Sequence, residues 1–389
     1  MQYNYVICQS GGPTSVINAS LYGVLKNAKS KVYGARYGIT GIINDNLIDL
    51  SEYDYEGLQY TPSAFLGSAR YNLSKEEDYQ KIVKNCLKYN IKYILINGGN
   101  DSMDTVDKLA NYFKTNSIDI NVMGIPKTID NDLAVTDHSP GYGSAIKFIA
   151  NTVSQIKLDT SSYEKGRVTI VEIMGRDAGW LAAGSKLASL VGNGPDLIYL
   201  PEVSFDKEQF LSDVKKIYEK NKKVLVCVSE GIKNKEGKYL LREFLTEENN
   251  DVFGHLQLGG CADVLSKLVC KELKYPVRTV ILELPQRCSV QLASLTDIKE
   301  AIECGKKAVE EVITETGKVV IMNRVSEYKI NYESVEVNKI ANLVKAFPIK
   351  WIINNNDIAK EFIDYALPLI NGEPALEFHN GLLVFKKIS

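Results

Sequence analysis

The stretches IKYILINGGNDS (91–102) and IDINVMGIPKTIDND (118–132) decide the fold of this chain. Each opens with a short apolar run that contains β-branched residues, and each run ends in a polar loop. Runs of this length and composition favour buried strands over buried helices. Residues 102–116, between them, have the length and spacing of a helix. Strand, loop, helix and strand in succession predict parallel strands. The helix carries the chain back to the end of the sheet where the first strand began, so the second strand runs in the same direction.

The same alternation extends over most of the chain. Further strands are predicted at 3–8, 167–174, 195–200, 222–229 and 278–284, and further helices at 14–30, 75–90, 206–221 and 262–273. From about residue 329 the pattern is less regular, with a turn near Trp351 that leads into a C-terminal helix. A chain of 389 residues is expected to form about two domains. The predicted class is therefore α/β with layered parallel sheets.

Composition and charge exclude several classes of partner. The net charge is −2, without the basic excess that a nucleic-acid-binding surface normally shows. No apolar stretch approaches the roughly 20 residues needed to span a bilayer, and the N-terminus has no basic segment of a secretory signal. The seven cysteines are scattered and form no C-x-x-C, which favours reduced thiols. We expect a cytoplasmic protein that binds neither nucleic acid nor membrane.

Two glycine loops follow predicted strands at the edge where doubly wound sheets bind ligands. In QSGGPTS (9–15), Gly11 and Gly12 would let backbone N–H groups approach an anion at a helix start, although a tight strand–helix turn also explains them. In NGGNDS (97–102), Asn100 and Asp101 offer oxygen ligands for a magnesium–phosphate group, whereas a turn capped by Ser102 is the alternative. Neither loop is a Walker A or G-x-G-x-x-G motif.

The third loop, PKTIDND (126–132), carries the most chemistry. Lys127 supplies an ammonium suited to phosphate oxygens. Asp130 is placed to accept the proton of an attacking hydroxyl, as a carboxylate does in protein kinases. A solvated loop is the alternative for this loop alone. Three loops of this type at one edge together favour a phosphate site.

These loops resemble the phosphofructokinase family, and the match runs in order over roughly residues 3–320. GSAR (67–70) is similar to the segment that brings an arginine, here Arg70, to the transferred phosphoryl group. PKTIDND resembles the family's catalytic loop, with Asp130 as the base. MGRDAGW (174–180) resembles the loop that binds the sugar phosphate, and SEG (229–231) resembles the segment whose glutamate binds the sugar. The resemblance implies sugar-phosphate contacts from Thr128, Ile129, Asp130, Met174, Gly175, Arg176 and Glu230.

The family's architecture sets the expected domains. The resemblance implies two Rossmann-like layered parallel-sheet domains with the active site in the cleft between them. Residues 1–140 and about 288–330 would form the donor domain, and 141–287 the sugar-phosphate domain. Residues 331–389 would form a C-terminal extension packed on both.

Two positions indicate the phosphoryl donor. ATP-dependent members usually carry Gly-Gly-Asp-Gly-Ser and Pro-Gly-Thr-Ile-Asp-Asn-Asp, and this chain has Asp101 and Lys127 at one glycine of each. Both residues resemble the pyrophosphate-dependent group. A carboxylate at Asp101 would repel a nucleotide α-phosphate, and Lys127 would supply charge to a leaving phosphate. The implied donor contacts are Gly11, Gly12, Arg70, Asp101 and Lys127, with Asp130, Lys127 and Asp101 as the catalytic set.

The metal position departs from the family pattern. Asn100 stands where the family has a metal-associated aspartate, and an amide oxygen is a weaker ligand than a carboxylate for a hard cation. Mg²⁺ is nevertheless the implied cofactor. Asn100 would bind it through its side-chain or its backbone carbonyl, with Asp101 and pyrophosphate supplying negative charge.

The arginines for the sugar 6-phosphate are chosen by spacing. GHLQLGG (254–260) superficially resembles the family's Gly-His-Ile-Gln-Arg-Gly-Gly stretch, but Leu258 stands where that stretch has its arginine. YPVRTVILELPQR (275–287) instead has Arg278 and Arg287 nine apart, which is the family's spacing, with Tyr275 nearby. Arg167 matches a family arginine that reaches the neighbouring subunit's sugar phosphate, although a solvated strand-edge residue is the alternative. A homodimer or tetramer is therefore expected.

The resemblance implies phosphoryl transfer from pyrophosphate to the 1-hydroxyl of fructose 6-phosphate, giving fructose 1,6-bisphosphate and phosphate, reversibly. The alternatives are an ATP-dependent 6-phosphofructokinase and a catalytically silent sugar-phosphate-binding regulatory subunit. A nicotinamide dehydrogenase is excluded because the sequence has no G-x-G-x-x-G with an acidic partner.

Overall fold

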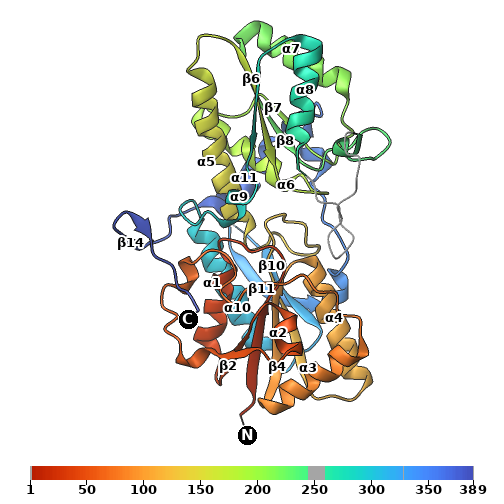
Figure 1. The fold of residues 1–389 in the computed structure, drawn as a ribbon, viewed down its shortest axis with the longest axis vertical. Helices are drawn as coiled ribbons and strands as arrows, with labels where there is room; N and C mark the ends of the chain where they lie inside the picture. The colour runs from red at the N-terminus through yellow and green to blue at the C-terminus, as the bar shows by residue number, and fades with distance from the viewer. Residues whose placement is uncertain (1, 244–258, 327, 389) are drawn as a thin grey trace.

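The computed structural model describes residues 2–243, 259–326 and 328–388, which form two lobes (Figure 1). The lower lobe contains a seven-stranded sheet in the order β11-β10-β5-β4-β1-β2-β3. Its strands are β1 (Asn4–Gln9), β2 (Val32–Ala35), β3 (Leu47–Asp49), β4 (Ile91–Gly98), β5 (Asn121–Pro126), β10 (Lys318–Arg324) and β11 (Ile330–Glu336).

The central strands of this sheet are parallel, as the sequence predicted, and the two edges are not. β3 pairs antiparallel with β2, and β11 pairs antiparallel with β10. A short turn joins β10 to β11, and a turn of that length can only reverse the chain, because a parallel pair needs a long crossover. The sequence analysis did not predict β2, β3, β10 or β11.

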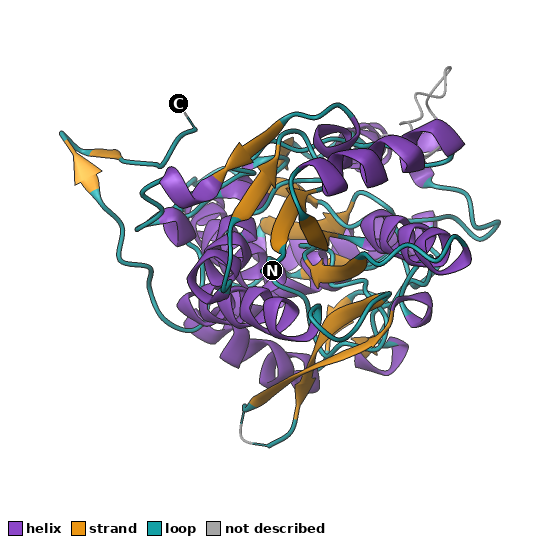
Figure 2. Ribbon diagram, turned by 90° about the horizontal axis from the view of Figure 1, so that it is seen from below, coloured by secondary structure: helices purple, strands orange, loops and turns teal. Residues whose placement is uncertain are grey.

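Helices cover both faces of the seven-stranded sheet, as seen from below in Figure 2. Tyr5 and Ile7 of β1 point to the face covered by α1 (Ile17–Asn27) and α10 (Leu295–Glu311). Val6 and Cys8 point to the opposite face. That face is covered by α2 (Ile39–Ile43), α3 (Glu76–Lys88) and α4 (Asn100–Thr115). A strand buried on both faces explains the continuous apolar runs in the sequence.

The upper lobe has a four-stranded, fully parallel sheet in the order β7-β8-β6-β9. The strands are β6 (Arg167–Ile173), β7 (Leu197–Tyr199), β8 (Lys223–Ser229) and β9 (Val277–Ile281). Helices α5 (Tyr142–Ser161) and α6 (Trp180–Gly184) pack on one face, and α7 (Lys207–Asn221) and α8 (Cys261–Leu273) on the other.

One predicted strand ends earlier than expected. The strand predicted at 278–284 stops at Ile281, and the four-residue helix α9 (Pro285–Cys288) begins soon after it. Pro285 occupies the first turn of α9, where its fixed φ suits a helix start and its missing N–H costs nothing. This break decides where Arg287 lies.

The C-terminal part returns across both lobes (Figure 1). After β11 the chain forms the hairpin β12 (Ile352–Ile353) and β13 (Asp357–Ile358), followed by α11 (Lys360–Ala366), which confirms the predicted turn and helix near Trp351. A second hairpin, β14 (Phe378–His379) with β15 (Leu382–Leu383), projects from the body (Figures 1 and 2). In the described part of the chain, no helix combines the length and apolarity needed to cross a bilayer.

Candidate active site

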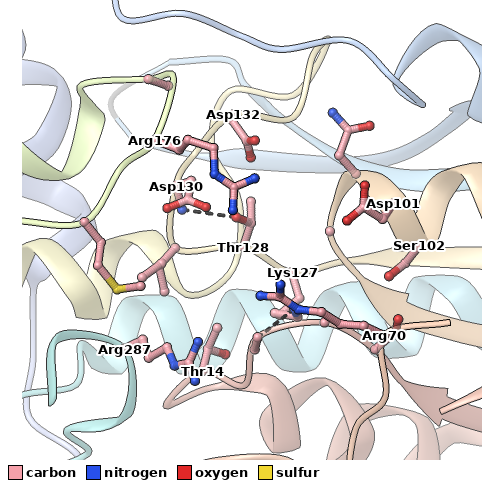
Figure 3. A pocket seen from close by; sticks show the side chains of 18 of the residues that line it. Thr14, Arg70, Asp101, Ser102, Lys127, Thr128, Asp130, Asp132, Arg176 and Arg287 are labelled. Atoms are coloured by element: carbon pink, nitrogen blue, oxygen red, sulfur yellow. Dashed lines mark hydrogen bonds between the residues drawn. The ribbon is translucent and has the colours of Figure 1, made fainter. Parts of the chain in front are cut away.

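A cleft of about 400 Å³ lies between the lobes, at the carboxyl ends of strands from both sheets. It is lined by loops that follow β1, β4 and β5 of the lower lobe and β6 and β8 of the upper lobe. It brings together most of the residues predicted from the sequence, namely Gly11, Gly12, Arg70, Asn100, Asp101, Lys127, Thr128, Ile129, Asp130, Met174, Arg176, Glu230 and Arg287. Figure 3 shows this cleft from close by.

Lys127 joins two of the loops on the donor side. Its side chain is buried, and Nζ donates a hydrogen bond of 2.8 Å to the carbonyl oxygen of Gly12. Burial lowers the pKa of Lys127 to about 8, although Asp130 opposes this effect. The ammonium therefore lies beside the first glycine loop, and its positive charge favours an anion there.

Asp130 and Asp132 lie on the same loop, and the guanidinium of Arg176 acts on Asp130 (Figure 3). Burial raises the pKa of Asp130, while Arg176 and then Lys127 oppose the rise. Burial and the neighbouring Asp130 raise the pKa of Asp132 to about 7. The N–H of Asp130 donates to Thr128 Oγ1 at 3.1 Å, which fixes the loop. A carboxylate in this setting is a stronger proton acceptor than one in water.

The upper lobe contributes Arg176 and Glu230 through two loops in close contact. Ser229 Oγ donates to the carbonyl oxygen of Gly175 at 2.7 Å, and Gly175 N–H donates to Glu230 Oε1 at 3.3 Å. A Cβ on Gly231 would lie 1.6 Å from the carbonyl oxygen of Arg176, so only glycine permits this approach. Burial, followed by Asp130, raises the pKa of Glu230 to about 7.

Arg287 enters the cleft from α9 and approaches the first glycine loop. A Cβ on Gly12 would lie 3.0 Å from a guanidinium nitrogen of Arg287, so the missing side chain makes room for the arginine. Burial lowers the pKa of Arg287, which remains a cation because its ordinary value is so high. Gln286 beside it accepts from Met174 N–H at 3.2 Å and ties α9 to the Met174 loop.

Asn100 lines the cleft, but its amide is engaged elsewhere. Asn100 Nδ2 donates to the carbonyl oxygen of Leu343 at 2.7 Å, and Asn342 N–H donates to Asn100 Oδ1 at 2.6 Å. Both ends of the amide thus bind the backbone of a C-terminal segment. Asn342 occupies one of the two lone pairs of Asn100 Oδ1, and Asn100 as the metal ligand stays a prediction.

Asp132 fits a hard cation better than Asn100. Its Oδ1 is buried and has no hydrogen-bond partner among the residues that the structure describes. A buried carboxylate oxygen without a partner is costly, and a bound cation would satisfy it. Within the described ranges no group of three or more His, Cys, Asp or Glu side chains is arranged to hold a metal ion. Mg²⁺ is commonly held by one or two carboxylates together with substrate phosphates, so this donor set suits it.

Besides Gly175, three predicted residues are not part of the cleft lining. Arg278 is exposed on β9, in register with Thr169 of β6. Tyr275 precedes β9 and stacks on Tyr218, with ring centroids 3.8 Å apart. Arg167 begins β6, and its guanidinium lies 4.2 Å from the Tyr163 ring centroid.

These positions separate the two arginines expected to share one phosphate. Arg287 lines the cleft, whereas Arg278 lies earlier on the edge strand β9, because the strand ends at Ile281 and the chain turns into α9. The structure therefore does not bring Arg278 and Tyr275 to this cleft with Arg287. Gly175 is not itself a lining residue but supports Glu230 from behind. Of the alternative stretch at 254–260, residues 254–258, including Leu258, lie outside the described residues.

Several lining residues were not predicted from the sequence as site residues, namely Ser10, Pro13, Thr14, Ala69, Gly99, Ser102, Asp132, Asp177, Ala178, Asn342 and Val344. Asp132 belongs to the quoted motif PKTIDND, and its second carboxylate was a usable signal. Asn342 and Val344 come from an irregular stretch near the C-terminus, where no motif points to a site.

Comparison with known proteins agrees with this geometry. Residues 4–281 match the model of the phosphofructokinase family. A protein of Xanthomonas campestris pv. campestris named pyrophosphate–fructose 6-phosphate 1-phosphotransferase is 38% identical over 96% of this chain and 93% of its own length. One of the same name from Halomonas elongata is 34% identical over 100% of this chain and 96% of its own.

A solved structure is similar as well. The crystal structure of pyrophosphate-dependent phosphofructokinase from Nitrosospira multiformis superimposes with a TM-score of 0.88 at 32% identity, covering 99% of this chain and 98% of that one. The family model matches more than half of the chain, and the relatives match nearly all of it. This chain belongs to the phosphofructokinase family.

Proposed function

We propose that this enzyme transfers a phosphoryl group from pyrophosphate to the 1-hydroxyl of fructose 6-phosphate, giving fructose 1,6-bisphosphate and phosphate, in a reversible reaction. The observation that carries the proposal is the meeting of Lys127 and Asp130 in one cleft between the glycine loops and Arg176. The relatives named as pyrophosphate-dependent phosphotransferases support the same reaction.

Asp130 is the proposed general base. Burial raises its pKa, and Arg176 and Lys127 keep the ionised form accessible. The carboxylate accepts the proton of the sugar hydroxyl as that oxygen attacks phosphorus, and a loose transition state tolerates a proton transfer that lags behind bond formation.

Arg176 and Glu230 are proposed to hold the sugar phosphate on the upper lobe, with Thr128, Ile129, Met174 and Gly175 shaping its site. Arg287 is proposed to bind the 6-phosphate, because its guanidinium makes paired hydrogen bonds with phosphate oxygens. Its entry from α9 places a cation at the cleft.

The donor site is proposed to consist of Gly11, Gly12, Arg70, Asp101 and Lys127. Lys127 stands beside the glycine loop and stabilises the charge that develops on the leaving phosphate. Asp101 lies in the first turn of α4, where its negative charge would repel the α-phosphate of a nucleotide donor.

We propose Mg²⁺ as the cofactor, held by Asp132 and by donor phosphate oxygens, with Asp101 nearby. The ion would neutralise phosphate charge during transfer. The partnerless Asp132 oxygen supports this choice over the engaged amide of Asn100.

The enzyme is proposed to act as a homodimer or a larger assembly in the cytoplasm, where all seven free cysteines would stay reduced. Arg167 and Arg278 lie on one face of the upper sheet, because Arg278 is in register with Thr169, two residues after Arg167. One Arg167 guanidinium nitrogen is buried and has no hydrogen-bond partner in the described part of the chain. We propose that both arginines reach a partner subunit's sugar phosphate.

The reverse reaction separates an enzyme from a sugar-phosphate sensor. Incubation of the protein with fructose 1,6-bisphosphate, phosphate and Mg²⁺ should release fructose 6-phosphate and pyrophosphate, measured by a coupled assay. Binding of the bisphosphate without turnover in either direction would contradict the proposed function and favour the sensor.

A further inference from the structure

A short C-terminal segment, residues 342–345, forms one wall of the cleft and is here called the strap. Asn342 and Val344 line the cleft directly. The strap is fastened to the start of α4 by the two hydrogen bonds of the Asn100 amide, at 2.7 Å and 2.6 Å. It therefore closes the cleft next to Asp101, on the donor side.

The other end of the strap is held at the catalytic loop. Lys345 N–H donates to the carbonyl oxygen of Asp132 at 2.7 Å, and Lys345 Nζ donates to the carbonyl oxygen of Asp137 at 2.9 Å. Trp180 Nε1 of the upper lobe donates to the carbonyl oxygen of Lys345 at 2.9 Å. Anchors in both lobes hold the strap in place across the cleft edge.

A row of polar side chains continues this wall to the segment that follows Arg70. Asn342 Nδ2 donates to Asp104 at 3.2 Å, and Lys108 on the next turn of α4 pairs with Asp104 at 2.7 Å. Lys108 also donates to Asn72 at 3.0 Å. This polar row is half exposed, so each contact is weak and the row can open at little cost.

The strap borders the cleft next to Asp101, and the polar row continues from it along α4. In the proposed donor site, a donor with two phosphorus atoms would end at Asp101, whereas a longer one would have to pass Asn100 and displace the strap. We propose that the strap limits donor length, as a specificity-determining wall that acts in addition to the charges of Asp101 and Lys127. This inference rests on the proposed function and extends it.

Inorganic tripolyphosphate tests the proposal, because it lengthens the donor without adding a nucleoside. Asn100→Ala removes both hydrogen bonds that Asn100 makes with the strap and keeps the contact of Asn342 with Asp104. Two ordinary hydrogen bonds shift an open–closed equilibrium by roughly tenfold. The ratio of kcat/KM for tripolyphosphate to kcat/KM for pyrophosphate should therefore rise about tenfold in this variant.

Asn342→Gly is a second, milder variant. Asn342 has a φ of 63°, which glycine adopts without strain, so the substitution removes the contact with Asp104 and keeps the backbone path. We expect a smaller rise in the same ratio. Asn116→Ala, at the other end of α4 and exposed, is the matched control and should leave the ratio unchanged.

The outcomes separate the strap from the proposed function. A wild-type protein without pyrophosphate activity would overturn the proposed function itself. If the wild type is active and the ratio stays within the spread of the control in both strap variants, the strap does not limit donor length. Loss of pyrophosphate activity in both variants with no gain on tripolyphosphate would also overturn it, since the strap would then serve catalysis alone.

Discussion

At the scale of single residues, Asp130 and Lys127 carry unequal parts of the account. The sugar hydroxyl must lose its proton whichever phosphoryl donor is used. The proposed role of Asp130 as base is therefore the same for pyrophosphate and for ATP. Lys127 bears on the choice of donor, and it does so together with Asp101. Both were predictable because they follow a buried strand in one short motif. The engagement of Asn100 was not, since its partner Asn342 lies 242 positions along the chain.

Asp130→Asn should lower kcat by roughly 10²- to 10⁴-fold, which is the usual contribution of a general base. The amide keeps the shape and loses the proton acceptor, so the KM for fructose 6-phosphate should change little. Steady-state assays with pyrophosphate measure both constants. Asp364→Asn, an exposed carboxylate on α11, serves as the control. A variant with near wild-type kcat would remove Asp130 from the role of base.

The pH dependence of donor use should report Lys127. Burial lowers its pKa to about 8, so the ammonium of the free enzyme is lost as the pH rises through that value. The kcat/KM for pyrophosphate should then fall above about pH 8. In Lys127→Arg the guanidinium stays charged, so this alkaline fall should disappear even if the activity is lower. The same fall in both proteins would show that another group titrates.

At the scale of elements, a buried charged cluster joins the catalytic loop to α10. His138 Nδ1 pairs with Asp137 at 2.8 Å, and Nε2 pairs with Glu300 at 2.7 Å. Arg324 of β10 also binds Asp137, and Tyr328 donates to Glu300 at 2.5 Å. Because α10 packs against β10 and α1, this cluster holds the loop that carries Asp130 against the lower lobe.

His138 should make the stability of the fold depend on pH. Burial lowers the pKa of His138, but Glu300 and Asp137 outweigh it and raise the value to about 9, against 6.5 for an ordinary histidine. The stabilisation is complete below pH 6.5 and is lost as the pH rises through 9, a change of roughly 3 kcal/mol.

The comparison of wild type with His138→Gln checks this expectation. The difference between their free energies of unfolding in urea should shrink from pH 6 to pH 9.5. His379→Gln, in the exposed hairpin strand β14, is the control. A difference that stays constant over this range would mean that His138 does not titrate between the two states.

The elements differ in how far the sequence could predict them. Strands β1, β4, β5, β6 and β8 were found because each is an apolar run followed by a recognisable loop. The end of β9 was misjudged, since ILEL continues the apolar pattern and only Pro285 marks the start of α9. The antiparallel edge strands β3 and β11 are half exposed and lack such runs.

At the scale of the whole molecule, the cleft joins two lobes, and the chain passes between them more than once (Figure 1). The location of the cleft could be predicted from the order of motifs, because carboxyl ends of parallel strands meet at one edge. The separation of Arg278 from Arg287 could not be predicted, because a spacing of nine residues says nothing of the turn between them. The strap forms its wall of the cleft through contacts between residues far apart in the sequence, such as Asn342 and Asn100.

Mixed oligomers should show whether subunits share their sites. Arg167→Ala and Asp130→Asn should each be strongly impaired alone. A mixed dimer holds one site with an intact Asp130 and an intact Arg167 from the partner. Refolding an equal mixture should therefore restore about a quarter of the wild-type activity per subunit, from random pairing in a two-fold dimer. A mixture no more active than its separate components would contradict a shared site.

The donor preference tests the central claim most directly. It is measured as kcat/KM with pyrophosphate and with ATP at saturating fructose 6-phosphate and Mg²⁺, for the wild type and for Asp101→Gly combined with Lys127→Gly. We predict that the wild type uses pyrophosphate and not ATP, and that the double variant gains ATP use and loses most pyrophosphate use. A wild type that prefers ATP, or a double variant that still strongly prefers pyrophosphate, would contradict the account.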